Sequence, residues 1–111
     1  MRATVYETEH YRRKAARLLS RGERASIRAA LAENPEVHDV IPGLGGIRKA
    51  RWSQQSRNKG KRSGVRVIYF YALSAGAVAL IDIYSKAEKE DLNAEDKKWL
   101  RSALEEIKRK L

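Results

Sequence analysis

The sequence predicts a single α+β domain, residues 1–111, in which a small antiparallel sheet packs against an N-terminal helix hairpin and a C-terminal helix. Two consecutive segments have apolar residues at helical spacing, three later segments read as strands, and a last segment is amphipathic. With 111 residues and 42% hydrophobic side chains, the chain has room for one modest core. The predicted order is β-α-α-β-β-β-α, and it leaves one face of the sheet free of helices.

The first third of the chain is expected to form an edge strand and a pair of helices. Ala3–Tyr6 is the predicted strand, and Thr8 caps the helix after it. Ser20 and Glu23 form a capping box that opens a second helix, and Pro35 stops it because proline has no N–H for the helical ladder. The apolar stripes of these two helices are Tyr11, Ala15, Leu18 and Leu19, then Ile27, Ala30 and Leu31.

Three strands are expected in the second half. They are Ile47–Trp52, Val65–Tyr71 and Val78–Tyr84, which contain the residue types that strands favour. A brief extended piece at Val40–Ile41 precedes them, and a turn at Leu73–Ala77 joins the last two strands into a hairpin.

Two loops and a helix complete the prediction. Pro42–Gly46 contains three glycines, and Ser53–Gly64 is a polar, basic segment that is too long for a tight hairpin. Asn93 caps the final helix, with acidic residues in its first turn. The apolar stripe of this helix is Leu100, Ala103, Leu104, Ile107 and Leu111.

The positive charge is concentrated in the middle of the chain. The protein has 24 basic and 14 acidic residues and a formal net charge of +10. Eight of the basic residues and none of the acidic ones lie between residues 40 and 81. This distribution is typical of a protein that binds a polyanion such as nucleic acid, and a solubilising surface is the alternative.

Several classes of protein are excluded or disfavoured. The absence of cysteine excludes iron–sulfur clusters, thiol catalysis and disulfide frameworks. The longest uncharged run, Val67–Ile81, falls short of the roughly 18 to 20 residues of a membrane span. His10 and His38 show no metal-ligand spacing and are interpreted as ordinary surface or packing residues. We therefore expect a cytoplasmic protein with no membrane partner, no metal and no cofactor.

Cationic side chains recur on the predicted strands with a period of two. Strand alternation puts Lys49 and Arg51 on one face of the first long strand and Arg48 on the other. An antiparallel sheet can gather such residues into a concave cluster, with no carboxylate to neutralise it. A solvated sheet face is the alternative that the pattern leaves open. The residues expected in the cluster are Lys49, Arg51, Arg66, Lys86 and Lys89.

Three segments resemble the HigB-type branch of the RelE superfamily of bacterial toxins. They read IPGLGGIRKARW at 41–52, GVRVIYFY at 64–71 and IYSKAEKEDL at 83–92, and an amphipathic helix follows. The resemblance implies the fold predicted above and ribosome-dependent cleavage of messenger RNA. It also implies a partner antitoxin, which we expect to be a small helix-turn-helix protein. The sequence has Ala87 where RelE carries a catalytic arginine and Asn93 where RelE has a tyrosine.

The resemblance and the chemistry of RNA together assign the site. RNA carries its own nucleophile, the 2′-hydroxyl, so the protein needs to gather positive charge around the phosphate and to move protons. Arg66 is expected to hold the phosphate through two hydrogen bonds, and Lys49 or Lys86, surrounded by other cations, to act as base or acid. The predicted catalytic residues are Lys49, Arg51, Arg66 and Lys86. The predicted RNA-binding residues are Arg48, Arg57, Lys59, Lys61, Arg62 and Lys89.

Some alternatives stay open at this point. Tyr69, Tyr71 and Tyr84 either stack on bases or pack in the core, and their position on strands favours the core. A ParE-like toxin that inhibits DNA gyrase has the same fold without a nuclease centre. A non-catalytic RNA-binding module needs only the concentrated charge. Product chemistry separates these classes, because only the nuclease leaves cyclic phosphate ends on ribosome-bound message.

Overall fold

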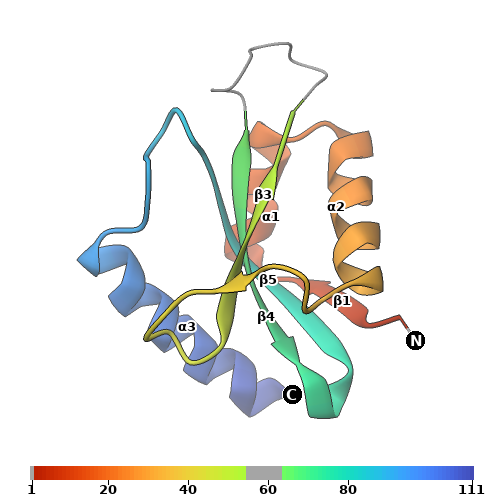
Figure 1. The fold of residues 1–111 in the computed structure, drawn as a ribbon, viewed down its shortest axis with the longest axis vertical. Coiled ribbons are helices and arrows are strands. Elements are labelled where there is room, and N and C mark those ends of the chain that lie inside the picture. The colour runs from red at the N-terminus through yellow and green to blue at the C-terminus, as the bar shows by residue number, and fades with distance from the viewer. Residues whose placement is uncertain (1, 55–63) are drawn as a thin grey trace.

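The computed structural model describes residues 2–54 and 64–111, and it contains a five-stranded sheet with helices on both faces (Figure 1). The strands lie in the order β1-β5-β4-β3-β2, with β1 parallel to β5 and the other neighbours antiparallel. The predicted α+β class is therefore confirmed. The elements are β1 (Thr4–Glu7), α1 (Glu9–Leu18), α2 (Arg21–Glu33), β2 (Asp39–Val40), β3 (Ile47–Trp52), β4 (Val65–Ala72), η3 (Leu73–Ala75), β5 (Ala77–Ser85) and α3 (Ala94–Lys110).

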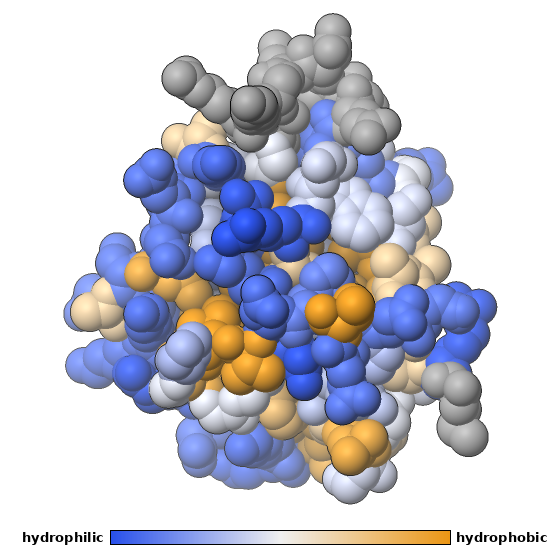
Figure 2. All heavy atoms as spheres, in the orientation of Figure 1, coloured by the Kyte–Doolittle hydropathy of each residue, from blue (hydrophilic) through white to orange (hydrophobic). Residues whose placement is uncertain are grey.

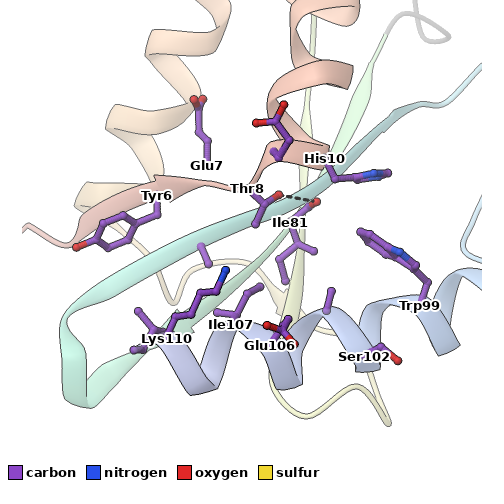
Figure 3. A pocket seen from close by; sticks show the side chains of 14 residues that line it. Tyr6, Glu7, Thr8, His10, Ile81, Trp99, Ser102, Glu106, Ile107 and Lys110 are labelled. Atoms are coloured by element: carbon purple, nitrogen blue, oxygen red, sulfur yellow. Dashed lines mark hydrogen bonds between the residues drawn. The ribbon is translucent and has the colours of Figure 1, made fainter.

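The helices begin where the sequence predicts. Thr8 accepts a hydrogen bond from the backbone N–H of Tyr11. Its own hydroxyl donates to the carbonyls of Leu80 and Ile81, which ties the start of α1 to β5 (Figure 3 shows the contact with Ile81). The capping box at Ser20 opens α2, and a second capping box at Asn93 opens α3. No helix in the described part of the chain is long and apolar enough to cross a membrane.

The sheet differs from the prediction at its edge and at one turn. The short extended piece lies one residue earlier than expected, at Asp39–Val40, and it counts as a fifth strand because it pairs with β3. The turn between β4 and β5 contains the short helix η3. Gly76 ends this helix with a φ of 59°, in the left-handed region that glycine adopts without strain.

The expectation of a helix-free sheet face is wrong. One face of the sheet packs against α1 and α2 through a core that includes Tyr11, Ile27 and Val67. The other face packs against α3, whose Leu100 and Leu104 belong to a second core. In Figure 1, α3 lies to the left of the strands and α2 to their right. The physical reason is that the apolar stripe of α3 must be buried, and the hairpin already occupies the first face. The residues that α3 meets in this second core include Leu44, Ile47, Ile68, Ile81 and Tyr84.

A register shift in β5 turns a carboxylate toward α1. Ile68 lies opposite Asp82 and Tyr69 lies opposite Leu80, so one extra residue is accommodated in β5. The side chain of Asp82 lies 2.9 Å from Nε2 of His10 and 3.0 Å from Nζ of Lys14. His10 is therefore a packing residue, as predicted.

Glu7 joins β1 to α2, and we expect Glu7→Gln to lower the free energy of unfolding at pH 7 by about 1–2 kcal/mol. Arg24 donates to both carboxylate oxygens, at 2.8 and 3.0 Å, and this hydrogen bonding lowers the pKa of Glu7 below 4.5. A lowered folded-state pKa stabilises the protein above the unfolded pKa and loses that effect as the pH falls. Urea denaturation across the acid range tests this: the difference between wild type and variant should shrink below pH 4.5. A difference that does not depend on pH would contradict the charge-based explanation.

Candidate active site

The predicted cations meet on the α3 side of the sheet, at the end where β3 finishes and β4 begins. Arg51 lies directly opposite Arg66 across the β3–β4 pair, and Arg66 lies opposite Tyr84 across the β4–β5 pair. Lys49 precedes Arg51 by two residues and faces the same side. The backbone N–H of Lys86 donates to the carbonyl of Gly64 at 3.0 Å, which puts Lys86 at the same end of the sheet. Together with Lys89, discussed below, these residues form the cationic cluster: Lys49, Arg51, Arg66, Lys86 and Lys89.

The cluster lies beyond the part of the sheet that α3 covers. Figure 2 shows strongly hydrophilic residues gathered over the upper part of the molecule, between the strands and the segment that leads into α3. Apolar residues come to the surface lower on the same view. The second face of the sheet is thus divided into an apolar half under α3 and a cationic half that is open.

Gly64 lies close to the backbone at the end of β3. A Cβ atom at this glycine would lie 3.2 Å from the carbonyl oxygen of Trp52 and 3.4 Å from Nη1 of Arg66. The same Nη1 donates weakly to the carbonyl of Val65 at 3.4 Å. This close approach could not be predicted from the sequence, because a lone glycine beside a loop is an ordinary feature.

Two carboxylates reach the cluster, so the expectation that none would neutralise it is wrong. Nζ of Lys49 lies 3.4 Å from Oδ1 of Asp91, and Nζ of Lys89 lies 3.1 Å from Oδ2 of Asp96. Hydrogen bonding from the N–H of Leu92 lowers the pKa of Asp91, and the positive charge of Lys49 adds to this. Both acids follow β5 in the sequence, outside the stretch between residues 40 and 81 on which the expectation rested.

The remaining cations of the cluster have no such partner. Within residues 2–54 and 64–111, neither Arg51, Arg66 nor Lys86 forms an ion pair. Like charges directly opposite each other on neighbouring strands destabilise a sheet. The Arg51–Arg66 pair is therefore unfavourable for folding and favourable for holding an anion between the strands.

The strand tyrosines belong mainly to the cores. Tyr69 and Tyr84 are fully buried, which confirms the packing interpretation for both, and Tyr71 is partly buried beside the first core. Burial, with Asp91 nearby, raises the pKa of Tyr84 to about 12, so its hydroxyl stays protonated at neutral pH. Nζ of Lys89 lies 5.4 Å from the centroid of the Tyr84 ring, and this cation–π contact orients the lysine over the sheet.

Arg48 is not part of the cluster. It lies on the opposite face of β3, as strand alternation predicts, and it donates to the carbonyls of Glu36 and His38 at 3.1 and 2.7 Å. These bonds hold the connection between α2 and β2. The predicted RNA-binding residues of the long basic loop lie outside the described residues; they are Arg57, Lys59, Lys61 and Arg62. Among the described residues, no group of three or more His, Asp or Glu side chains is placed to hold a metal ion.

The fold is similar to that of solved bacterial toxins. A doubly substituted variant of the Escherichia coli toxin RelE in the free state superposes with a TM-score of 0.59 at 16% identity, covering 81% of this chain and 90% of that one. The RelBE2 toxin–antitoxin complex of Mycobacterium tuberculosis gives 0.58 at 20% identity, covering 77% and 99%. The isolated E. coli RelE toxin gives 0.55 at 18% identity, covering 98% and 99%. No protein-family model matches the sequence. The chain therefore has the fold of the RelE toxins.

Proposed function

We propose that this protein is the toxin of a type II toxin–antitoxin pair and that it cleaves messenger RNA on the ribosome. The observation that carries the proposal is the pair of opposed arginines, Arg51 and Arg66, on the sheet half that α3 leaves open. The RelE-like fold supports it. Membership of the HigB-type branch rests on the sequence segments alone.

The cationic cluster contains the positive charges that a protein needs to stabilise the transition state of RNA cleavage. The 2′-hydroxyl attacks the adjacent phosphorus, the bond to the 5′-oxygen breaks, and the products are a 2′,3′-cyclic phosphate and a 5′-hydroxyl. Arg66 holds the non-bridging oxygens, since a guanidinium forms two parallel hydrogen bonds to phosphate. Arg51, directly opposite, adds charge stabilisation as the phosphorane forms.

Proton transfer falls to the lysines. The proton of the 2′-hydroxyl must leave and the departing 5′-oxygen must gain one, and we assign these two transfers to Lys49 and Lys86 without distinguishing their order. Ala87 stands where RelE carries a catalytic arginine and Asn93 where RelE has a tyrosine, and neither side chain offers a titratable group for these transfers. Lys89 contacts the RNA backbone.

Asp91→Asn is expected to strengthen RNA binding about two- to fivefold, because an incoming phosphate then has no carboxylate to displace from Lys49. The Asp91 side chain is 70% exposed, which keeps the effect small. The measurement is a fluorescence-anisotropy titration with an RNA whose 2′-deoxy cleavage site cannot react. Glu106→Gln, at an exposed ion pair on α3, is the matched control. Equal affinities of the two variants would show that Asp91 does not compete with RNA.

A cell that makes this toxin must keep it silent, and we expect the product of the neighbouring gene to be a small helix-turn-helix antitoxin. The concentrated positive charge favours an inhibitor with acidic segments. Co-expression should restore growth, and the two proteins should co-purify as a tight complex. Toxicity that persists with no co-purification would refute this assignment.

Induction of the protein in a bacterial host tests the function itself. Growth should stop, and primer extension on a reporter message should reveal new 5′ ends within the translated region. Growth arrest with intact messages and inhibited DNA supercoiling would instead identify a gyrase inhibitor. Binding to RNA with neither effect would identify a non-catalytic module.

A further inference from the structure

A second group of cations lies at the turn between α1 and α2. Arg13 and Arg17 are one helical turn apart on α1, and Arg21 is the first residue of α2. All three side chains are exposed. None of them forms an ion pair with any residue in the described ranges. We call these residues the hairpin-end arginines.

The packing places this turn at the same end of the molecule as the cationic cluster. The side-chain amide of Gln54, which is 4% exposed, donates to the carbonyl of Leu18 at 2.8 Å. This bond fastens the end of α1 to the chain just after β3. Trp52 lies opposite Val65, and Val65 lies opposite Ser85. The last turn of α1, the end of β3, the start of β4 and the end of β5 therefore meet, and Figure 1 shows them together at the top of the molecule.

The orientation of α1 brings its arginines toward the open edge of β5. Lys14 reaches Asp82 of β5 at 3.0 Å, so this side of the helix runs along that strand. Arg17 lies three residues after Lys14 and shares its side of the helix. Beyond the end of β5 comes Lys86, a member of the cationic cluster. The cations of α1 and those of the sheet thus lie at the same end of β5, on opposite faces of the sheet.

Arg17 suits the helix dipole in the last turn of α1, but two other features of the local charge arrangement are unfavourable for folding. Arg13 and Arg17 are like charges at i and i+4, which destabilise a helix. Arg21 puts a positive charge on the first turn of α2, where the helix dipole favours a negative one. Glu23 is the acidic residue of that turn, and its carboxylate accepts the N–H of Ser20. Such breaches of local rules are expected at functional sites.

We infer that the hairpin-end arginines are a second contact surface for the phosphate backbone of structured RNA. An RNA bound at the cationic cluster would continue past the end of β5 onto the α1–α2 turn. Guanidinium groups on a rigid helix suit phosphate contacts that position a nucleic acid without reading its sequence. The inference concerns binding only, and it goes beyond the cleavage proposed above.

The test compares two triple variants with equal loss of charge. Arg13→Gln, Arg17→Gln and Arg21→Gln neutralise the hairpin end. Lys108→Gln, Arg109→Gln and Lys110→Gln, in the last turn of α3, are the matched control. Binding to purified bacterial ribosomes and to an isolated RNA duplex is measured across a series of salt concentrations.

The hairpin-end variant should bind both probes at least tenfold more weakly than the control near 0.1 M salt. The slope of log K against log salt should fall by about 2 to 3, one phosphate contact for each arginine. Its melting temperature should not fall, since like-charge repulsion has been removed, and a fall would indicate a structural role instead. Affinity and slope equal to those of the control would overturn the inference. The same comparison is made on a DNA duplex of the same sequence, and a larger effect on duplex DNA than on duplex RNA would overturn the assignment to RNA.

The two probes separate this inference from the proposed function. The wild-type protein could bind the RNA duplex but not ribosomes. If the hairpin-end variant then binds the duplex more weakly, the RNA-binding surface is supported and cleavage on the ribosome is rejected. The hairpin-end variant could instead bind ribosomes and cleave messages as well as the control does. That result would support the proposed function and reject the hairpin-end arginines as an RNA-binding surface.

Discussion

Replacing Arg66 with alanine is expected to abolish growth arrest and to slow message cleavage by at least about 10²–10³-fold, the typical effect of removing a preorganised charge-stabilising donor. The variant should still fold. Among the described residues, the guanidinium of Arg66 makes only a weak bond to the neighbouring Val65 carbonyl, and its removal relieves the repulsion from Arg51. Arg66→Lys should recover little activity, because an ammonium cannot form the paired hydrogen bonds of a guanidinium.

The measurement is single-turnover cleavage of a programmed ribosome, with circular dichroism to confirm the fold. Arg109→Ala is the matched control, since it removes an exposed arginine at the far end of α3. Full toxicity of a folded Arg66→Ala protein would show that Arg66 does not hold the reacting phosphate.

Cleavage of free RNA is expected to be very slow compared with cleavage of the same message in the decoding site. In the part of the chain that the structure describes, neither histidine lies in the cationic cluster: His10 contacts Asp82, and His38 packs against Tyr69. We therefore expect cleavage to depend on a geometry of the RNA that the protein does not itself provide. A ribosome that holds the message near in-line geometry can supply on the order of 7–11 kcal/mol through orientation.

Purified protein is incubated with one message, free and in a programmed ribosome, and the rates of cutting are compared. A message bound to ribosomes whose decoding site is empty is the control. It shows whether holding the message near the ribosome is enough to speed cleavage. Equal rates on free and programmed message would identify an ordinary ribonuclease.

Much of the fold could be predicted from the sequence because its signals are local. Capping residues such as Thr8 and Ser20 fix where helices begin within one residue, and runs of β-branched and aromatic residues such as Val65–Ala72 fix the long strands. The face that α3 covers could not be predicted. An amphipathic stripe indicates that one side of a helix is buried, but it does not indicate which surface covers that side. The register shift beside Asp82 also depends on tertiary packing.

The site could be predicted in part for a similar reason. Period-two alternation correctly separates Lys49 and Arg51 from Arg48, which instead holds the α2–β2 connection through backbone carbonyls. The carboxylate of Asp91 reaches Lys49 from 42 residues away in the sequence, and no local pattern reports such a contact. Charge counted along the chain therefore overstated the positive charge of the cluster.

The chemistry of the new RNA ends tests the account most directly. Message cut on the ribosome by the purified protein is treated with polynucleotide kinase variants that do or do not remove a cyclic phosphate, and is then ligated to an adapter. The cationic cluster acting on the 2′-hydroxyl predicts 2′,3′-cyclic phosphates and 5′-hydroxyls, and predicts that both vanish with Arg66→Ala. Fragments that carry 3′-hydroxyls and 5′-phosphates would contradict it, because a water molecule and not the RNA itself would then be the nucleophile.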